Sequence, residues 1–493
     1  MLLDPGAERS GGITDDRAVL QAMLDVETAW VRVQHRLGLV DDGTVTAVTT
    51  AAEADRHDVA RIARAAEDGG NPVIPMLASL RETLHETLHE TLHETLDEQR
   101  TADRHAAGVH SVGGGAAAAD IDAAVHRGLT SQDVVDTALM GIGARALDAL
   151  GASLASGADA LARLADAHRR TVRVARTLGQ PALPTTFGLT AADWLSALDD
   201  ACDELAGTRA SLPVQCGGAV GTLAAIEAVA PGRSLAAADV LAEELGLASH
   251  GRPWHTDRGP VTRLGDVLVR TADTMGRIAA DIVLSSRLEI GELREPPAEG
   301  RGGSSTLPQK QNPVLSVLIR SAAIEAPHLG AVLHSAAGLA VDERPDGAWH
   351  AEWGALLRLV RRVVVAAAQL EEVLSGLVVD ADAMRRHVDE MGPALLSERV
   401  LTEVAALPNG AAAVAALRPV LHGRARARHL TPLLRAYLPE AVLSDADIED
   451  LLDPLQYLGA TEALIDRALA RHDAGNHARH AAPAHPDPSQ GEP

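Results

Sequence analysis

The sequence predicts an all-α protein built around a helical bundle. Hydrophobic residues make up 46% of the 493-residue chain, whereas aromatic residues make up only 2%. Ala and Leu dominate and favour helix strongly, and the aromatic residues that favour strands are nearly absent. Apolar residues also recur with helical period over several long tracts. Long helices of this kind pack against one another in bundles, and a chain of this length has room for about three domains.

The N-terminal part is expected to form helices joined by turns. Thr14 is a suitable N-cap for a first helix with an apolar face lined by Val19, Leu20, Met23, Leu24, Trp30, Val31 and Leu37. The run Gly69-Gly70-Asn71-Pro72 predicts a turn before another helix. Residues 82–97 read ETLH-ETLH-ETLH-ETLD, a tandem repeat that favours an exposed helical extension, although histidines spaced i, i+4 could instead share a metal ion. Residues 111–119, SVGGGAAAA, are typical of a flexible connector.

Longer helical tracts follow, and then a region of shorter ones. Helical periodicity covers 131–168, 188–212, 235–292, 312–338 and 350–377. Beyond Asp380 the pattern shortens, Asn409-Gly410 interrupts it, and the run from Ser444 to Asp447 has the form of a helix cap. We therefore predict an N-terminal helical domain over 1–107, a central bundle over 108–377, a smaller helical domain over 378–473 and a disordered tail over 474–493.

Charge and cysteine content narrow the class of protein. A formal net charge of -24 argues against a nucleic-acid partner, because phosphate binding needs clustered Lys and Arg. Cys202 and Cys216 form no disulfide or metal-ligand pattern. The N-terminus has no signal-peptide pattern, and apolar stretches such as 363–370 are too short to span a bilayer. We expect a cytoplasmic protein with no membrane partner, no nucleic-acid partner and no metal.

The single lysine of the chain lies in an unusual loop. Of the 44 Lys and Arg residues, Lys310 is the only lysine, and it lies in a stretch from Gly300 to Pro313 that also holds Ser304, Ser305 and Asn312. An ammonium is a compact charge with three rotatable donors, which a planar guanidinium cannot replace at a tight site. We interpret this stretch as a catalytic or anion-binding loop; the alternative is a flexible surface loop that retained one lysine by chance.

Two further segments combine Gly with polar side chains at helix boundaries. They are His126-Arg-Gly-Leu-Thr130-Ser131-Gln-Asp133 and Arg176-Thr177-Leu178-Gly-Gln-Pro181-Ala-Leu-Pro184-Thr-Thr186-Phe-Gly188. Thr130-Ser131 and Pro184-Thr-Thr186 could simply cap the helices that follow them. A helix N-terminus is also a ready anion site, because its free N–H groups and dipole favour carboxylates. Three such termini in one helical protein indicate a carboxylate-rich substrate.

These segments resemble the signature regions of the fumarase/aspartase superfamily. The run Gly303-Ser304-Ser305-Thr-Leu307-Pro-Gln-Lys310-Gln-Asn312 is similar to its G-S-S-x-M-P-x-K-x-N signature, with Leu307 in place of Met. The segments at 126–133 and 176–184 are similar to its other two regions, and the resemblance runs from about residue 15 to 472. It implies three helical domains per subunit, a homotetramer with a shared central bundle, active sites drawn from three subunits, and no cofactor.

Within the superfamily, other stretches resemble the 3-carboxy-cis,cis-muconate cycloisomerases, which form 4-carboxymuconolactone in protocatechuate degradation. These stretches are 69–75, 215–222, 253–258 and 347–353. The resemblance implies a tricarboxylate substrate, with Ser304 as the general acid and base, Lys310 supplying positive charge, Asn312 holding an enolate, and His126 orienting the substrate or moving a proton. It also implies a set of substrate-binding residues, which comprises Thr130, Ser131, Arg176, Thr177, Gln215, Arg258 and Ser305.

One departure from the superfamily pattern distinguishes among the reactions that members of the superfamily catalyse. Leu178 stands where the superfamily usually has a histidine, and Pro181 stands where many members have a second one. An amine, a guanidine or water leaves poorly as an anion and needs a general acid, whereas a carboxylate, with an ordinary pKa of about 4, leaves unprotonated. Leu178 therefore favours the cycloisomerase over the first alternative, an adenylosuccinate-lyase-like eliminase. The second alternative is a non-catalytic homologue, which the intact Ser304, Lys310 and Asn312 set argues against.

Overall fold

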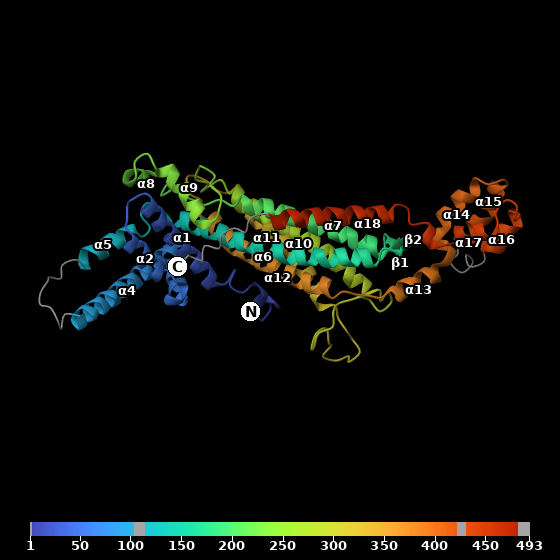
Figure 1. Ribbon diagram of the computed structural model, residues 1–493, viewed down its shortest axis with the longest axis horizontal. Helices are drawn as coiled ribbons and strands as arrows, with labels where there is room; N and C mark the ends of the chain where they lie inside the picture. Colours follow the sequence, from blue (N-terminus) through green and yellow to red (C-terminus); the bar gives the residue numbers. More distant parts are fainter. Residues whose placement is uncertain (1, 103–113, 422–429, 482–493) are drawn as a thin grey trace.

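The computed structural model describes residues 2–102, 114–421 and 430–481 of the chain. It is an elongated, mostly helical molecule, as the sequence predicted (Figure 1). A long bundle occupies its middle, the N-terminal helices lie at one end, and a small helical lobe lies at the other.

Within the described residues, five long helices form the bundle. They are α6 (Ser131–Ala167), α7 (Phe187–Ala210), α10 (Gly259–Ser285), α11 (Val314–Gly338) and α12 (Gly347–Ser375). Helix α6 packs against α7 and α12, while α11 packs between α10 and α12. Apolar residues recur at helical spacing on the inner faces, as with Leu147, Leu150, Leu154 and Leu161 of α6, which are all at least 98% buried. Helix α6 is also long and apolar enough to cross a membrane, but most of its apolar stretch is buried inside this bundle.

The bundle helices run alternately up and down, which decides where the connecting segments lie. Helices α6, α10 and α12 begin near the N-terminal helices, and α7 and α11 begin at the opposite end (Figure 1). At about 1.5 Å per residue, the 37 residues of α6 separate the two ends of the bundle by roughly 55 Å. The predicted segments at 176–188 and 300–313 lie at the far end from the segment at 126–133.

Local signals explain most helix boundaries and two differences from prediction. The first long helix, α1 (Asp16–Arg36), is capped by Asp15 and not by Thr14, because the Asp15 carboxylate accepts from the N–H of Ala18. The predicted tract over 235–292 is wrong as one helix. It is divided into α9 (Ser234–Leu245), which ends at a left-handed Gly246, and α10, which has Pro260 in its first turn.

The N-terminal end contains the predicted turn and the repeat helix. Its elements are η1 (Ala7–Ser10), α1, α2 (Asp42–Ala51), η2 (Ala54–Arg56), α3 (Val59–Gly69), α4 (Val73–Ala102) and α5 (Gly114–Ala124), with α8 (Ala224–Val229) and α9 beside them. The turn at 69–72 joins α3 to α4, and the repeat over 82–97 is helical as predicted. Residues 114–119 belong to α5 and not to a connector, while residues 103–113 and the side chains of residues 90–118 lie outside the described part.

Two small sheets and a second core complete the fold. Strands β1 (Val172–Thr177) and β2 (Gln180–Thr186) form an antiparallel hairpin between α6 and α7, and β3 (Leu293–Arg294) pairs with β4 (Val378–Val379). The C-terminal lobe comprises α13 (Ala381–Met391), η4 (Gly392–Leu396), α14 (Ser397–Ala405), α15 (Gly410–Leu421), α16 (Leu430–Tyr437), α17 (Asp445–Leu451) and η6 (Pro454–Gln456). It has its own apolar core, and Ser444 caps α17 as predicted.

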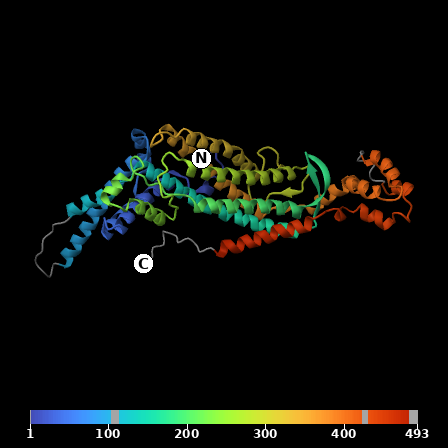
Figure 2. The same cartoon turned by 90° about the horizontal axis from the view of Figure 1, so that it is seen from above.

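The last helix, α18 (Thr461–Ala481), returns from the lobe to the bundle. Figures 1 and 2 show it running beside α7. His472 fixes it there, because its ring nitrogens contact Asp199 of α7 at 3.0 Å and Asp159 of α6 at 2.9 Å. The helix continues to Ala481, so residues 474–481 are helical where a disordered tail was expected, and 482–493 lie outside the described residues.

Candidate active site

The segment at 126–133 is held at the start of α6 by two buried carboxylates. The His126 ring donates from Nδ1 to Oε1 of Glu27 at 2.6 Å, and the N–H of His126 donates to the other Glu27 oxygen at 2.9 Å. Because Glu27 holds Nδ1, Nε2 is the ring nitrogen left to face a ligand. Thr130 caps α6 together with Asp133, which accepts from the N–H of Thr130 at 3.0 Å. Thr130 and Ser131 remain partly exposed.

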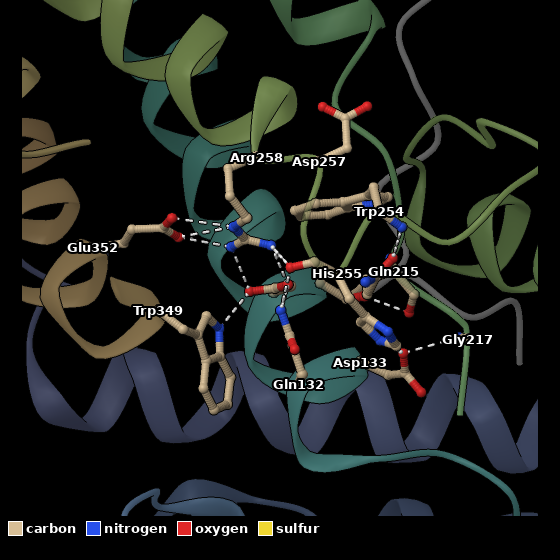
Figure 3. A network of polar contacts seen from close by, with 12 residues as sticks. Gln132, Asp133, Gln215, Gly217, Trp254, His255, Asp257, Arg258, Trp349 and Glu352 are labelled. Atoms are coloured by element: carbon tan, nitrogen blue, oxygen red, sulfur yellow. Dashed lines mark hydrogen bonds and ion pairs between the residues drawn. The ribbon is translucent and has the colours of Figure 1, made fainter. Parts of the chain in front are cut away.

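Asp133 joins this segment to the loop after α7. Its buried carboxylate accepts from the backbone N–H groups of Gly217 and Gly218, each at 2.9 Å, and from Nε2 of His255 at 2.9 Å (Figure 3). With the N–H of Thr130, four donors therefore converge on this carboxylate, which ties the segment at 126–133 to the distant residues 217, 218 and 255. The predicted helix cap is present, and it is one part of a buried group of hydrogen bonds to the Asp133 carboxylate.

Arg258 lies inside the protein and not at a surface that a substrate reaches. Its side chain is fully buried and contacts Asp136 at 2.7 Å and Glu352 at 2.7 Å (Figure 3). Burial lowers the pKa of this guanidinium, but the two carboxylates outweigh that effect and the net shift is upward. All of its nitrogens donate within the cluster, one also to the backbone oxygen of His255. We therefore assign Arg258 a structural role in place of the substrate contact expected from sequence.

Gln215 is likewise enclosed. Its side chain has no exposed area, its Oε1 accepts from the N–H of Trp254 at 2.9 Å, and its backbone N–H donates to Thr137. Its Nε2 has no hydrogen-bond partner among the described residues. The side chain braces the turn at Trp254 (Figure 3).

The segment at 176–188 forms the hairpin of β1 and β2. Arg176 at the end of β1 donates to buried Glu292 at 2.9 Å, and Arg173 and His387 contact the same carboxylate. Burial raises the pKa of Glu292, but these donors outweigh it and hold that pKa below its ordinary range. Thr177 is exposed, and Leu178 at the tip is fully exposed with a φ of 50°. Thr186 caps α7 through the N–H of Leu189, as the capping alternative predicted.

The third segment is a closed loop with a narrow neck. The backbone N–H and the Nδ2 of Asn312 both donate to the carbonyl of Gly302, at 2.8 and 2.9 Å. Gly302 has a φ of 74°, and a Cβ there would lie 2.7 Å from the Asn312 oxygen, so the neck requires glycine. Inside the loop, Ser304 Oγ accepts from the N–H groups of Thr306 and Leu307, at 3.3 and 3.1 Å.

This geometry suits a serine that gives up its proton. Two backbone N–H groups that point at one hydroxyl oxygen favour its anionic form. Ser305 and Lys310 lie exposed on the same loop, where they can meet an anionic ligand. Asn312 uses one amide N–H at the neck and keeps the other for a ligand.

The structure therefore divides the predicted residues into two groups. Arg176 and Thr177 end β1 and the Ser304 loop precedes α11, both at the far end of the bundle, whereas His126, Thr130 and Ser131 lie where α6 begins, at the near end. Sequence reasoning missed Glu27, Asp133 and Glu292, the buried acids that hold the predicted residues. Asp133, three residues after the cap Thr130, carried the only local signal for such a role.

Comparison with known proteins identifies the relatives of this fold. A lyase family model matches residues 8–327. A nitrosuccinate lyase of Streptomyces davaonensis is 41% identical over 465 residues, which cover 93% of this chain and 91% of that protein. A 3-carboxy-cis,cis-muconate cycloisomerase of Bradyrhizobium diazoefficiens is 37% identical, with 92% of this chain and 94% of that protein covered. The crystal structure of a 3-carboxy-cis,cis-muconate lactonizing enzyme from Pseudomonas putida superposes with a TM-score of 0.80 at 32% identity, covering 94% of this chain and 96% of that one.

Proposed function

This chain belongs to the lyase family of the fumarase/aspartase superfamily, and we propose that it is a 3-carboxy-cis,cis-muconate cycloisomerase. In that reaction a carboxylate of the substrate adds across a double bond and closes a lactone, while a proton is delivered to the carbon next to another carboxylate. In the reverse direction a base removes that proton and the ring carboxylate leaves. The reaction therefore needs an acid and base at carbon, donors for an enolate, and no proton for the leaving group.

Leu178 is the observation that supports a leaving group that departs as an anion. It occupies the exposed tip of the β1–β2 hairpin, at the place where the superfamily pattern has histidine. A leucine cannot donate a proton, so the group that leaves must be stable as an anion. A carboxylate meets this condition, whereas the amine that an adenylosuccinate-lyase-like eliminase expels does not.

The Ser304 loop supplies the remaining chemistry. Ser304 removes and returns the proton, with its anionic form favoured by two loop N–H groups. Lys310 pairs with a substrate carboxylate, and the free amide N–H of Asn312 contributes to binding the enolate oxygens. Ser305, Thr130, Ser131, Arg176 and Thr177 bind the remaining carboxylates, while His126 presents Nε2 to the substrate.

Such a site requires more than one copy of the chain. His126 precedes the start of α6 and Ser304 precedes the start of α11. These starts lie at opposite ends of the bundle, where α6 alone is roughly 55 Å long, so one subunit cannot bring both residues to one substrate. Antiparallel association of bundles would place the near end of one beside the far end of another. We accordingly propose a homotetramer with shared active sites, acting on a small tricarboxylate.

A nitrosuccinate lyase is the second candidate, because the Streptomyces relative of that name is 41% identical over nearly the whole chain. Elimination from nitrosuccinate would break a C–N bond and release nitrite together with fumarate. Nitrite also leaves as a stable anion, so Leu178 is compatible with this reaction as well. The Ser304 loop would perform the same proton removal next to a carboxylate.

Parallel assays on three substrates test these alternatives. With 3-carboxymuconate, we expect loss of the ultraviolet absorbance of the conjugated diene. With nitrosuccinate, colorimetric nitrite release reports the second activity, and adenylosuccinate serves as the amine-releasing control. A higher kcat/KM on nitrosuccinate than on 3-carboxymuconate would replace the first proposal with the second. Turnover of adenylosuccinate would contradict the leaving-group argument itself.

A further inference from the structure

The N-terminal arm, residues 4–9, lies along one face of α12. Asp4 contacts Arg362 at 2.9 Å, and Arg9 contacts Glu372 at 2.7 Å. Between them, Gly6 has a φ of 84°, and a Cβ there would lie 2.9 Å from Nε2 of Gln369. The contacted positions 362, 369 and 372 are spaced by seven and three residues, so they share one helix face. The arm is therefore seated at three points along α12.

Glu372 at the end of this face also holds the catalytic loop. One of its oxygens accepts from Arg9, and the other accepts from Nη2 of Arg301. Arg301 immediately precedes Gly302, the neck residue that both Asn312 donors contact. A single carboxylate thus connects the N-terminal arm to the neck of the loop that carries Ser304 and Lys310.

A second anchor fixes the other side of the neck. The Glu295 carboxylate accepts from the N–H groups of Leu315 and Ser316, at 3.2 and 2.6 Å, and so caps the start of α11. That contact ties the chain after Asn312 to Glu295, which lies seven residues before Gly302. The Glu372 contact restrains the residue directly before Gly302, because it holds the Arg301 side chain.

We propose that Arg9 and Glu372 are positioning residues, which set the Ser304 loop for the reaction through Arg301. The inference rests on the proposed function, since it assigns these residues a role in orienting the base of that same site. Arg9 holds one Glu372 oxygen and thereby directs the other at Arg301. Neither residue contacts the loop beyond its neck, so their effect is on where the loop lies and how far it moves.

Lys310 provides a direct measure of this movement. A lysine-specific endoprotease has one cleavage site in this chain, after Lys310 and inside the exposed part of the loop. Cleavage of the native protein into fragments 1–310 and 311–493 requires the loop to extend into the protease. Its rate therefore reports loop freedom without any substrate.

The experiment compares Glu372→Gln and Arg9→Gln with the matched control Arg17→Gln. Arg17 is another N-terminal arginine, which contacts exposed Asp55 far from the loop. We expect Glu372→Gln to be cleaved about three- to ten-fold faster than the parent and Arg9→Gln about two- to three-fold faster, because half-exposed ion pairs contribute modestly. The control should be cleaved at the parent rate.

Kinetics complete the test. In both variants kcat should fall by about the factor by which cleavage rises, with a smaller change in KM, because a misplaced base slows proton transfer more than binding. Parent-like cleavage of both variants, or faster cleavage with parent-like kcat, would overturn the positioning role. A fully active Ser304→Ala enzyme would instead overturn the proposed function, while the protease result would still decide whether the arm restrains the loop.

Discussion

The buried cluster around Arg258 makes a quantitative prediction, because its two carboxylates are not equivalent. Asp136 accepts from two Arg258 nitrogens and also from Trp349 Nε1 at 2.9 Å and Gln132 Nε2 at 3.1 Å. Glu352 accepts from Arg258 alone among the described residues. One cation therefore faces two buried carboxylates, and burial raises the pKa of Glu352 above its ordinary value despite the Arg258 contacts.

The two amide variants should therefore differ. Asp136→Asn removes the charge that best balances Arg258 and turns an amide N–H toward its donors, so we expect a loss of about 3 kcal/mol in the free energy of unfolding. Glu352→Gln removes the surplus negative charge, and its amide oxygen can still accept from Arg258. We expect that change to lie within about 1 kcal/mol of the parent.

The two effects can be measured by urea unfolding at fixed protein concentration, at pH 5 and pH 8. Because the folded pKa of Glu352 is raised, its contribution to stability is complete below the unfolded pKa of about 4.3 and is lost as pH rises through the folded pKa. Glu352→Gln lacks this loss, so its stability relative to the parent should increase from pH 5 to pH 8. Equal destabilisation by both variants at both pH values would refute the unequal roles.

Four further variants test the site. Ser304→Ala should lower kcat at least about 100-fold without changing substrate binding, and near-parent turnover would remove Ser304 from the mechanism. Lys310→Arg should be severely impaired because a guanidinium is larger and planar; full activity in a steady-state assay would show that only charge matters. Leu178→His should not raise kcat on 3-carboxymuconate, and a clear increase would disprove the leaving-group argument. Glu292→Gln should destabilise the protein at pH 7 and less so near pH 4 in thermal melts, since the lowered pKa of Glu292 gives a contribution that disappears as pH falls; a constant difference across pH would contradict the Arg176 pairing.

Local sequence signals predicted the helical class and most boundaries. The turn at 69–72, the cap at Ser444 and the break at Asn409 each depend on a few neighbouring residues with fixed backbone preferences. The prediction failed over 235–292, where Gly246 and Pro253 lie in a tract that otherwise keeps helical periodicity. The turn residues decide the structure there, because α9 ends at the left-handed Gly246 despite the continuing periodicity.

The expected substrate contact of Arg258 differs from its buried position in the structure for another reason. The substrate contact expected of Arg258 came from resemblance to a family segment, and a resemblance over six residues holds no information about distant partners in this chain. Asp136 is 122 positions away and Glu352 is 94 positions away, so only the packing of α6, α10 and α12 reveals that the guanidinium is already paired. Sequence reasoning predicted three carboxylate-binding segments, but it could not tell which of their side chains are exposed and which hold the segments in place.

The three predicted segments differ in how the surrounding structure holds them. Buried acids hold two of the three segments: Glu27 and Asp133 hold the one at 126–133, and Glu292 holds the hairpin. The Ser304 loop differs, since its contacts concentrate at the neck and leave residues 305–311 exposed. Because binding groups need fixed positions and a base must reach the substrate after it binds, the proposed mechanism makes this loop the element whose placement controls turnover. Its attachment through Glu372 is then the point at which a distant change, in the first nine residues, can alter the rate without touching the substrate.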